Sequence, residues 1–323
     1  MARVDPKEKA KHIQAALPGL RALVSSCRVC GRACGVDRLG AGLGYCRANA
    51  GDGDHARWSA AVLHFGEEPM LVGRGGSGTV FFSHCNLRCL FCQNWQISHE
   101  GEGRLGHFSE LARAFMDLQA QGAENINLVT PTQYIYPAVQ ALGLACAQGL
   151  NLPVVYNTNG YDAVELVGLL DGIVDIWLPD LKYMESAPAA RHSRAADYPE
   201  VAQAAVQAMW RQTGPLVLAD GAARRGVIIR HLVLPENQSG TFEFLLWLKD
   251  HDMTGVTLSL MSQYSPQFRA AECPEINRSL TPKEYDDVVD FAASLGFEQV
   301  LTQEMASRAV YLPDFEKDEP FRQ

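Results

Sequence analysis

The residues best suited to chemistry are three cysteines that stand within eight residues of one another, Cys85, Cys89 and Cys92. Cysteine thiolates are the usual ligands of iron–sulfur clusters, and so short a segment can wrap them around one metal centre. A 4Fe–4S cube with three protein ligands keeps one iron open, which is the position that a catalytic centre needs. The alternative is a structural zinc ion with His84 or His99 as its fourth ligand. The spacing thus favours an open iron–sulfur cluster in which the three cysteines are catalytic.

Four further cysteines precede this group with the spacing C-x2-C-x3-C-x11-C, at Cys27, Cys30, Cys34 and Cys46. Four thiolates suit a closed tetrahedral zinc site, and they also suit a second iron–sulfur cluster that is fully ligated by protein. A closed centre holds structure or carries electrons, whereas an open one performs chemistry. We expect a metal here because so short a segment needs a bound metal or a similar cross-link to fold, and we favour zinc over an iron–sulfur cluster.

Length and composition set the wider limits. The chain has 323 residues, of which 47% are hydrophobic, and a formal net charge of −9. It can therefore bury a sizeable core, and its acidic balance argues against partners such as nucleic acid or anionic membranes. The N-terminal residues lack the apolar stretch of a secretory signal, and no run approaches the roughly 18 apolar residues of a membrane span. We therefore expect a cytoplasmic protein whose cysteines bind metal rather than form disulfides.

Two cysteines lie outside both groups. Cys146 falls in an apolar helical segment, where we expect it to pack in the core. Cys273 falls in a polar loop, where we expect a solvated, incidental thiol. We also expect His231, on an apolar run, to be a satisfied core histidine.

Apolar runs alternate with helical segments along most of the chain, which predicts repeated βα units. The runs are continuous, as in parallel strands that are buried on both faces. They cover residues 79–82, 126–130, 153–156, 173–178, 227–234, 256–260 and 299–302, and the helical segments between them cover 108–121, 134–147, 163–170, 199–213, 241–251 and 282–295. Such units build a doubly wound sheet or a barrel, and both folds place ligands at the carboxyl ends of the strands. Residues 1–26 show a helical pattern that we expect Pro18 to interrupt.

The first cysteine group, with the aromatic Phe91 directly before its third cysteine, resembles the signature of the radical S-adenosylmethionine (SAM) superfamily. The resemblance covers roughly residues 75–302 and implies an α/β fold, a partial (β/α)6 TIM-like barrel with a small N-terminal cysteine-rich extension. It implies that a 4Fe–4S cluster binds SAM at its open iron and cleaves it reductively to a 5′-deoxyadenosyl radical, which abstracts a substrate hydrogen. The cofactors supply that chemistry, and the protein positions and shields them. Phe91 would lie beside the cofactor.

Several segments are similar to the branch related to pyruvate formate-lyase activating enzyme: 75–79 (GGSGT), 157–160 (NTNG), 178–183 (LPDLKY) and 229–235 (IRHLVLP). This resemblance implies that Asp180, Lys182 and Arg230 lie near the cofactor, with a structural Asp180–Arg230 ion pair as the alternative. Asn159 would contact cofactor or substrate, or else belong to a turn with Gly160 at positive φ.

The chain departs from the branch in two places. Thr130 and Thr132 stand where many members carry a glycine-rich segment, and 84 residues precede the first cysteine of the signature. Activation of a glycyl radical enzyme is therefore one version of the function, with a protein substrate and a reductant such as flavodoxin or ferredoxin as partners. A two-centre electron-transfer protein and a zinc-stabilised binding module are the competing functions.

The same patterns divide the chain. We expect an N-terminal cysteine-rich metal-binding extension over residues 1–70, a radical SAM core over 71–305, and a C-terminal tail over 306–323. Residues 313–323 of this tail are charged, and we expect them to be loosely attached.

Overall fold

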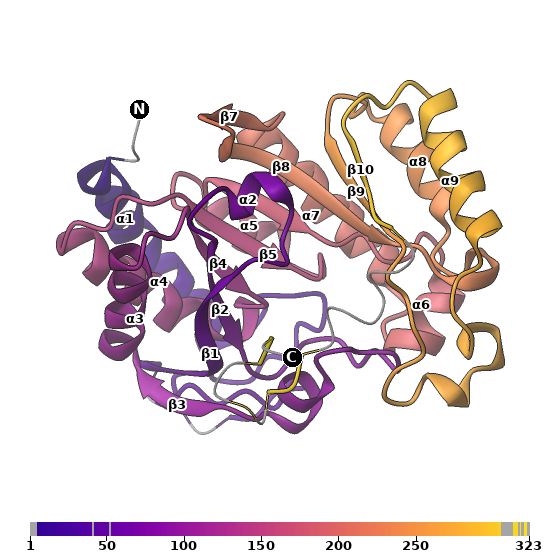
Figure 1. Ribbon diagram of the computed structural model, residues 1–323. Coiled ribbons are helices and arrows are strands. Elements are labelled where there is room, and N and C mark those ends of the chain that lie inside the picture. Colours follow the sequence, from indigo (N-terminus) through magenta and orange to yellow (C-terminus); the bar gives the residue numbers. More distant parts are fainter. Residues whose placement is uncertain are drawn as a thin grey trace.

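One curved sheet forms the centre of the molecule (Figure 1). The computed structural model describes residues 5–40, 42–51, 53–304, 313–315, 317 and 320–321. Within them, seven strands run parallel to their neighbours and follow one another across the sheet. They are β2 (Ser77–Phe82), β4 (Ile126–Val129), β5 (Val154–Thr158), β6 (Ile176–Pro179), β8 (Ala222–Leu232), β9 (Thr257–Met261) and β10 (Val300–Thr302).

Three antiparallel strands extend this sheet. β1 (His55–His64) pairs with β2, β3 (Arg104–His107) pairs with β1, and β7 (Val217–Ala219) pairs with β8. The strand order β10-β9-β8-β6-β5-β4-β2-β1-β3 leaves β10 and β3 at opposite edges, so the sheet is an open, partial barrel. The fold class is therefore confirmed. The antiparallel strands were not expected, because β1 buries only alternate residues along its first half and lacks the continuous apolar run of a central strand.

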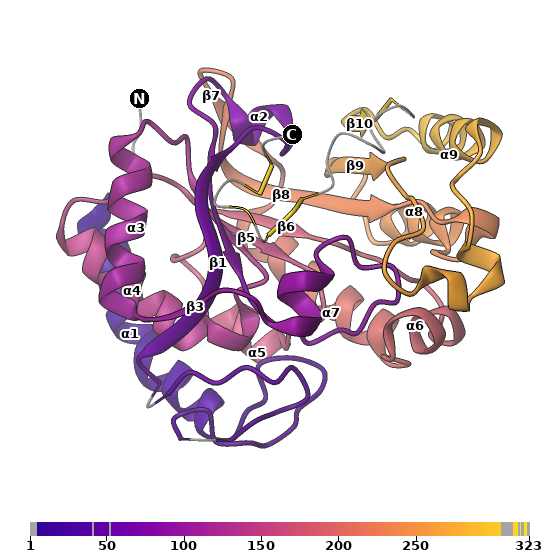
Figure 2. The ribbon, with the colours of Figure 1, turned by 60° about the horizontal axis from the view of Figure 1, so that its bottom comes forward.

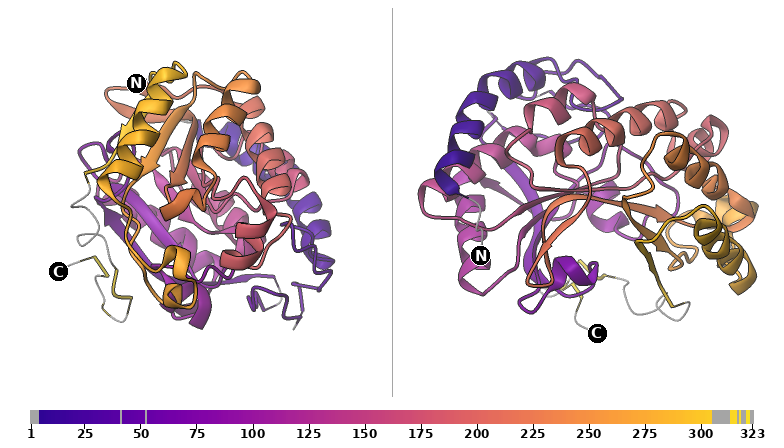
Figure 3. Two further views of the ribbon diagram at one scale, coloured as in Figure 1. Left: turned by 90° about the vertical axis from the view of Figure 1, so that its right-hand side faces the viewer. Right: turned by 90° about the horizontal axis from the view of Figure 1, so that it is seen from above.

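Helices lie along the outer side of the curved sheet (Figure 3). The six that connect the parallel strands begin and end within one residue of the expected segments: α3 (Phe108–Ala120), α4 (Ile135–Ala147), α5 (Val164–Leu169), α7 (Tyr198–Thr213), α8 (Thr241–Asp250) and α9 (Pro282–Ser294). Two short helices, α2 (Pro69–Val72) and α6 (Ser186–Ser193), were not expected. No helix among the described residues is long and apolar enough to span a membrane.

The first helix, α1 (Pro6–Ser25), runs without interruption through Pro18, so the expected break there is wrong. Proline leaves the carbonyl four residues earlier without its helical hydrogen bond. That carbonyl belongs to Gln14, an exposed residue whose carbonyl can turn to water. The buried stripe from Ile13 to Val24 holds the helix on the core throughout.

The cysteine-rich segment after α1 lies at one end of the molecule (Figure 2). Its backbone joins the loop after β5, because Gly31 N–H donates to Tyr161 O at 3.3 Å and Ala163 N–H donates to Val29 O at 3.1 Å. The domain boundary near residue 70 stays a prediction, and β1, on its N-terminal side, belongs to the main sheet.

Part of the expected tail lies outside the described residues. Where it is described, Phe315 is buried, and Phe315 and Phe321 pack against Phe81 at ring-centroid distances of 5.5 and 5.1 Å. These described tail residues are therefore attached to the sheet rather than loose.

Candidate functional site

A cavity of about 250 Å³ opens at the carboxyl ends of β2, β4, β5 and β6. All three cysteines of the signature line it, together with Asp180, Lys182 and Arg230. This is the edge at which parallel strands present their following loops, so chain segments far apart in sequence meet there. The structure thus brings together most of the residues that the sequence singled out.

Each sulfur of the signature has a polar partner from a different part of the fold. Asn159 Nδ2–H donates to Cys85 Sγ at 3.2 Å, and Ser193 Oγ–H donates to Cys89 Sγ at 2.9 Å. The Cys92 sulfur lies 3.1 Å from Ser98 Oγ. Donors aimed at sulfur favour the thiolate form and tune an iron–sulfur cluster.

The cysteine thiols themselves are hard to ionise without a cation. Burial raises the pKa of Cys85 to about 12 and that of Cys92 to about 11, and it raises the pKa of Cys89 as well. A bound metal or cluster releases such protons and holds the thiolates. The donor set therefore fits a metal centre.

The distances between possible ligand atoms help to distinguish an iron–sulfur cluster from a single zinc ion. Among the described residues, His192, Cys273 and Glu275 form the group whose potential ligand atoms all lie within 4.8 Å of one another. The three sulfurs of the signature do not all lie within that distance of one another. Around one zinc ion with bonds of about 2.3 Å, tetrahedral sulfurs would lie about 3.8 Å apart. This arrangement favours a cluster over a single zinc ion.

The two histidines considered as fourth zinc ligands have different places. His84 lines the cavity, whereas His99 packs against Phe268 with ring centroids 4.6 Å apart and the rings tilted by 48°, and its Nε2 lies 3.2 Å from Cys89 O. Burial lowers the pKa of each imidazole to about 4, so both stay neutral near pH 7.

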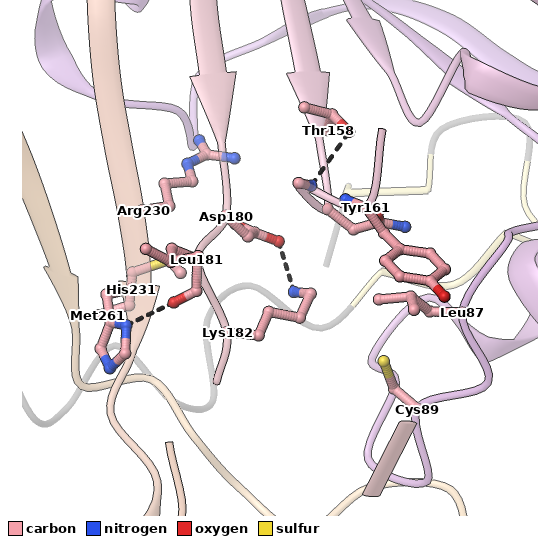
Figure 4. Close-up of polar contacts among 12 residues, drawn as sticks. Leu87, Cys89, Thr158, Tyr161, Asp180, Leu181, Lys182, Arg230, His231 and Met261 are labelled. Atoms are coloured by element: carbon pink, nitrogen blue, oxygen red, sulfur yellow. Dashed lines mark hydrogen bonds and ion pairs between the residues drawn. The ribbon is translucent and has the colours of Figure 1, made fainter. Parts of the chain in front are cut away.

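Asp180 and Lys182 form an ion pair above the cysteine loop (Figure 4). Lys182 Nζ lies 2.5 Å from Asp180 Oδ2. Burial alone would lower the pKa of Lys182, but the Asp180 carboxylate and the Cys89 sulfur outweigh it and raise that pKa to about 12. The ammonium group is therefore a fixed positive charge on the cavity wall. Tyr198 sets its backbone, since Lys182 N–H donates to the Tyr198 hydroxyl at 2.9 Å.

Arg230 lines the cavity but pairs with glutamates that the sequence did not single out. Its Nε donates to Glu68 Oε1 at 2.8 Å, and its Nη2 donates to Glu68 Oε2 at 2.6 Å and to Glu67. The Asp180–Arg230 alternative is therefore not the main pairing, although the two residues are neighbours across a parallel β-bridge. No local pattern could reveal these partners, which stand 162 and 163 residues away.

The segment after β5 forms the turn that the sequence predicts, and it also lines the cavity. Gly160 has φ of 80°, and a Cβ there would lie 2.2 Å from Asp180 O, so the turn requires glycine. Asn159 lines the cavity while its Nδ2 contacts the Cys85 sulfur. Thr130 also lines the cavity, whereas Thr132 faces the core and donates to Asp162 Oδ1 at 2.8 Å.

Phe91 packs edge-on against Tyr264 with ring centroids 5.7 Å apart, and it is not among the residues that line the cavity. In this position it anchors the cysteine loop. Its contact with a cofactor stays a prediction. His231 is fully buried, with its ring nitrogens 2.6 Å from Leu181 O and 2.9 Å from Thr241 Oγ1, as expected of a satisfied core histidine.

The second cysteine group surrounds an arginine. Arg38 Nε–H donates to Cys27 Sγ at 2.8 Å, and its Nη2 donates to Cys46 Sγ at 3.1 Å and faces Cys34 Sγ at 4.0 Å. A small cavity of about 10 Å³ lies beside these residues and Cys30. The buried guanidinium group thus lies among three of the four sulfurs and donates hydrogen bonds to them.

Asn86 connects the two cysteine groups. Its side chain hydrogen-bonds the Cys30 thiol, and its Oδ1 accepts from Asn159 Nδ2 at 2.6 Å. Asn159 in turn donates to Cys85. A short hydrogen-bonded route therefore runs from the closed cysteine group to the open one.

Comparison with known proteins agrees with this site. Residues 79–207 match the family model described as the radical SAM superfamily. A protein of Methanocaldococcus jannaschii, described only as uncharacterized, is 29% identical over 287 residues, which cover 86% of this chain and 77% of that protein. HydG, a maturase of the FeFe-hydrogenase, aligns with 14% identity and a TM-score of 0.45 over 68% of this chain. The chain spans about half (48%) of the length of HydG.

The matched segment contains the complete cysteine signature and three of the parallel strands that bear the cavity. Residues 79–207 therefore carry a radical SAM domain, and this type of domain implies a 4Fe–4S cluster and SAM. The resemblance stated from the sequence is confirmed at the level of the superfamily. Its placement in the pyruvate formate-lyase activating branch stays a prediction.

Proposed function

We propose that this enzyme cleaves SAM reductively at a 4Fe–4S cluster held by Cys85, Cys89 and Cys92 and abstracts a substrate hydrogen with the resulting 5′-deoxyadenosyl radical. The observation that carries the proposal is three half-buried cysteines on the wall of one cavity, each with a polar side chain within hydrogen-bond distance of its sulfur. Three protein ligands leave a site for a chelating cofactor, and the sulfur spacing supports a cluster.

The residues around the cavity have distinct roles in this proposal. The Lys182 ammonium, held by Asp180, offers hydrogen bonds to a carboxylate or a ribose oxygen. Arg230 and its two glutamates fix the far wall, with the Asn157 side chain 3.5 Å from Arg230 Nη1. Phe81, Phe82 and the described tail residue Phe321 give the cavity apolar walls, which exclude water from a reactive intermediate.

The substrate and partners belong to the same proposal. The similarity to the activating-enzyme branch supports a protein substrate, such as the glycine segment of a glycyl radical enzyme. A small acidic electron carrier of the flavodoxin or ferredoxin kind would supply the electron. A cytoplasmic location accords with the need of such clusters for reducing conditions.

For the second cysteine group we propose a bound metal centre, either zinc or a second iron–sulfur cluster. The hydrogen-bonded route through Asn86 and the Arg38 donors support a cluster that passes electrons to the first one. Counting iron distinguishes the two: reconstituted protein with two cubes holds about eight irons per chain, and protein with one cube and a zinc ion holds about four.

The proposed function is tested by electron paramagnetic resonance on anaerobically reconstituted, reduced protein. Adding SAM should change the cluster spectrum, because the cofactor binds the open iron. The Cys89→Ala variant should lose that response, while Cys146→Ala, which removes a buried cysteine remote from the cavity, should keep it. A wild-type spectrum that ignores SAM would favour a two-centre electron-transfer protein instead.

A further inference from the structure

A third group of metal-ligating side chains lies outside the cavity, at His192 on α6 and at Cys273 and Glu275 in the loop between β9 and α9. A His192 ring nitrogen, the Cys273 sulfur and a Glu275 carboxylate oxygen all lie within 4.8 Å of one another. His192 is fully buried and Cys273 is 6% exposed. The expectation of a solvated Cys273 is therefore wrong. Two consecutive 3-10 turns, Ala270–Glu272 and Pro274–Ile276, fold this polar loop so that the thiol points inward.

The hydrogen bonds of His192 prepare it as a ligand. Its Nε2 lies 3.1 Å from Gln238 Oε1, and because an amide oxygen only accepts, Nε2 carries the proton. Nδ1 then carries a lone pair, and this buried nitrogen has no hydrogen-bond partner among the described residues. Metal-ligating histidines have this arrangement, in which one ring nitrogen donates to an oxygen and the other faces the metal.

We propose that His192, Cys273 and Glu275 bind a zinc ion, with water as the fourth ligand. An imidazole nitrogen, a thiolate and a carboxylate are ligands that zinc accepts together, whereas calcium and magnesium avoid sulfur. With normal zinc bonds these donor atoms would lie about 3.5 Å apart, so shifts of about an ångström close the site.

Charge and protons balance in this site. The thiolate and the carboxylate together neutralise the two positive charges of the ion, and Cys273 releases its thiol proton to solvent on binding. Arg191, which pairs with Glu275 from the solvent side, holds one carboxylate oxygen and orients the other.

A zinc ion here would fasten the two segments that hold the signature loop. Leu90 N–H donates to His192 O at 2.8 Å, and Arg269 N–H donates to Leu90 O at 2.8 Å. The residue after His192, Ser193, donates to the Cys89 sulfur. The proposed ion therefore joins α6 to the 269–276 segment directly behind the cysteine loop, in a structural role that is independent of SAM cleavage.

The test is the zinc content of the full-length protein, purified anaerobically from zinc-supplemented cells and dialysed against a competing chelator. Wild type should hold one equivalent of zinc more than Cys273→Ser and more than Glu275→Gln. Cys146→Ser, which alters another buried cysteine, should match wild type. Zinc at the N-terminal cysteines would contribute equally to all four proteins. Equal zinc in wild type and Cys273→Ser, or none in wild type, would overturn the proposal.

A second measurement tests the site even if one of the variants fails to fold. Anomalous scattering at the zinc edge, recorded from crystals of wild-type protein, should give a peak between His192, Cys273 and Glu275. A map without that peak would refute the site whatever the variants show. Loss of SAM cleavage with this zinc retained would instead count against the proposed function alone.

Discussion

Replacing Arg230 by methionine should destabilise the protein strongly even without any cofactor. Arg230 forms ion pairs with both Glu67 and Glu68, whose side chains are only 6% exposed. Methionine keeps much of the volume but leaves two carboxylates side by side in a buried site. Removing one partner of a buried ion pair costs about 3–5 kcal/mol, because the remaining charge loses its compensation. For a chain of this size that corresponds to a fall in Tm of about 4–7 °C.

Differential scanning calorimetry of the apoprotein measures the effect. Arg224→Met is a matched control on the same strand, because Arg224 lies 3.8 Å from Glu124 at a more exposed site. That pair should contribute about 0–1 kcal/mol. Neutralising the stranded carboxylates in the variant Glu67→Gln/Glu68→Gln/Arg230→Met should restore part of the lost stability.

The pH dependence gives a second readout. In Arg230→Met, burial without a counter-ion raises the carboxyl pKa of Glu68 above its value in the unfolded chain. A raised folded-state pKa means that the folded protein binds protons more readily, so the stability deficit should shrink as the pH falls from 7 towards 5. A Tm within 1 °C of wild type at pH 7, or a deficit that grows on acidification, would refute the reasoning.

Three other substitutions test single contacts. Ser193→Ala should leave the iron content unchanged but lower the reduction potential of the cluster, because the reduced cluster loses the hydrogen bond to Cys89. A hydrogen bond worth about 1 kcal/mol corresponds to about 40 mV in a redox titration. An unchanged potential would contradict that contact. Asp162→Ala should lower the free energy of unfolding by about 3 kcal/mol, as measured by chemical denaturation, because the buried hydroxyls of Thr132, Thr158 and Tyr156 lose the carboxylate that accepts from them. A decrease below about 1 kcal/mol would argue against this network. Cys27→Ser should remove the N-terminal metal while the signature cluster stays, and loss of both together would show that the sites are not independent.

The arrangement of strands and helices could be predicted from the sequence because buried strands and helix faces require apolar residues in recognisable patterns. Parallel strands covered on both faces need apolar runs, and β6, which reads IWLP and is buried along its whole length, shows one in full. β1 was harder to predict, since it buries only alternate residues along its first half and is rich in alanine.

The site was predictable only where its residues are neighbours in the chain. The signature cysteines and the Asp180–Lys182 pair stand in short motifs, and the structure places them together on one cavity. Glu67, Ser193 and Cys273 carry no such motif, because their roles depend on contacts made across more than 80 residues. Folding of the loop, rather than its composition, also decided that Cys273 is buried.

The most direct test of the account is the product formed from SAM by anaerobically reconstituted, dithionite-reduced protein. Wild type and Cys146→Ala should both release methionine and 5′-deoxyadenosine, and Cys89→Ala should release neither. No 5′-deoxyadenosine from wild type with a full complement of iron, or equal amounts from Cys89→Ala, would contradict the assignment of the reactive centre to Cys85, Cys89 and Cys92.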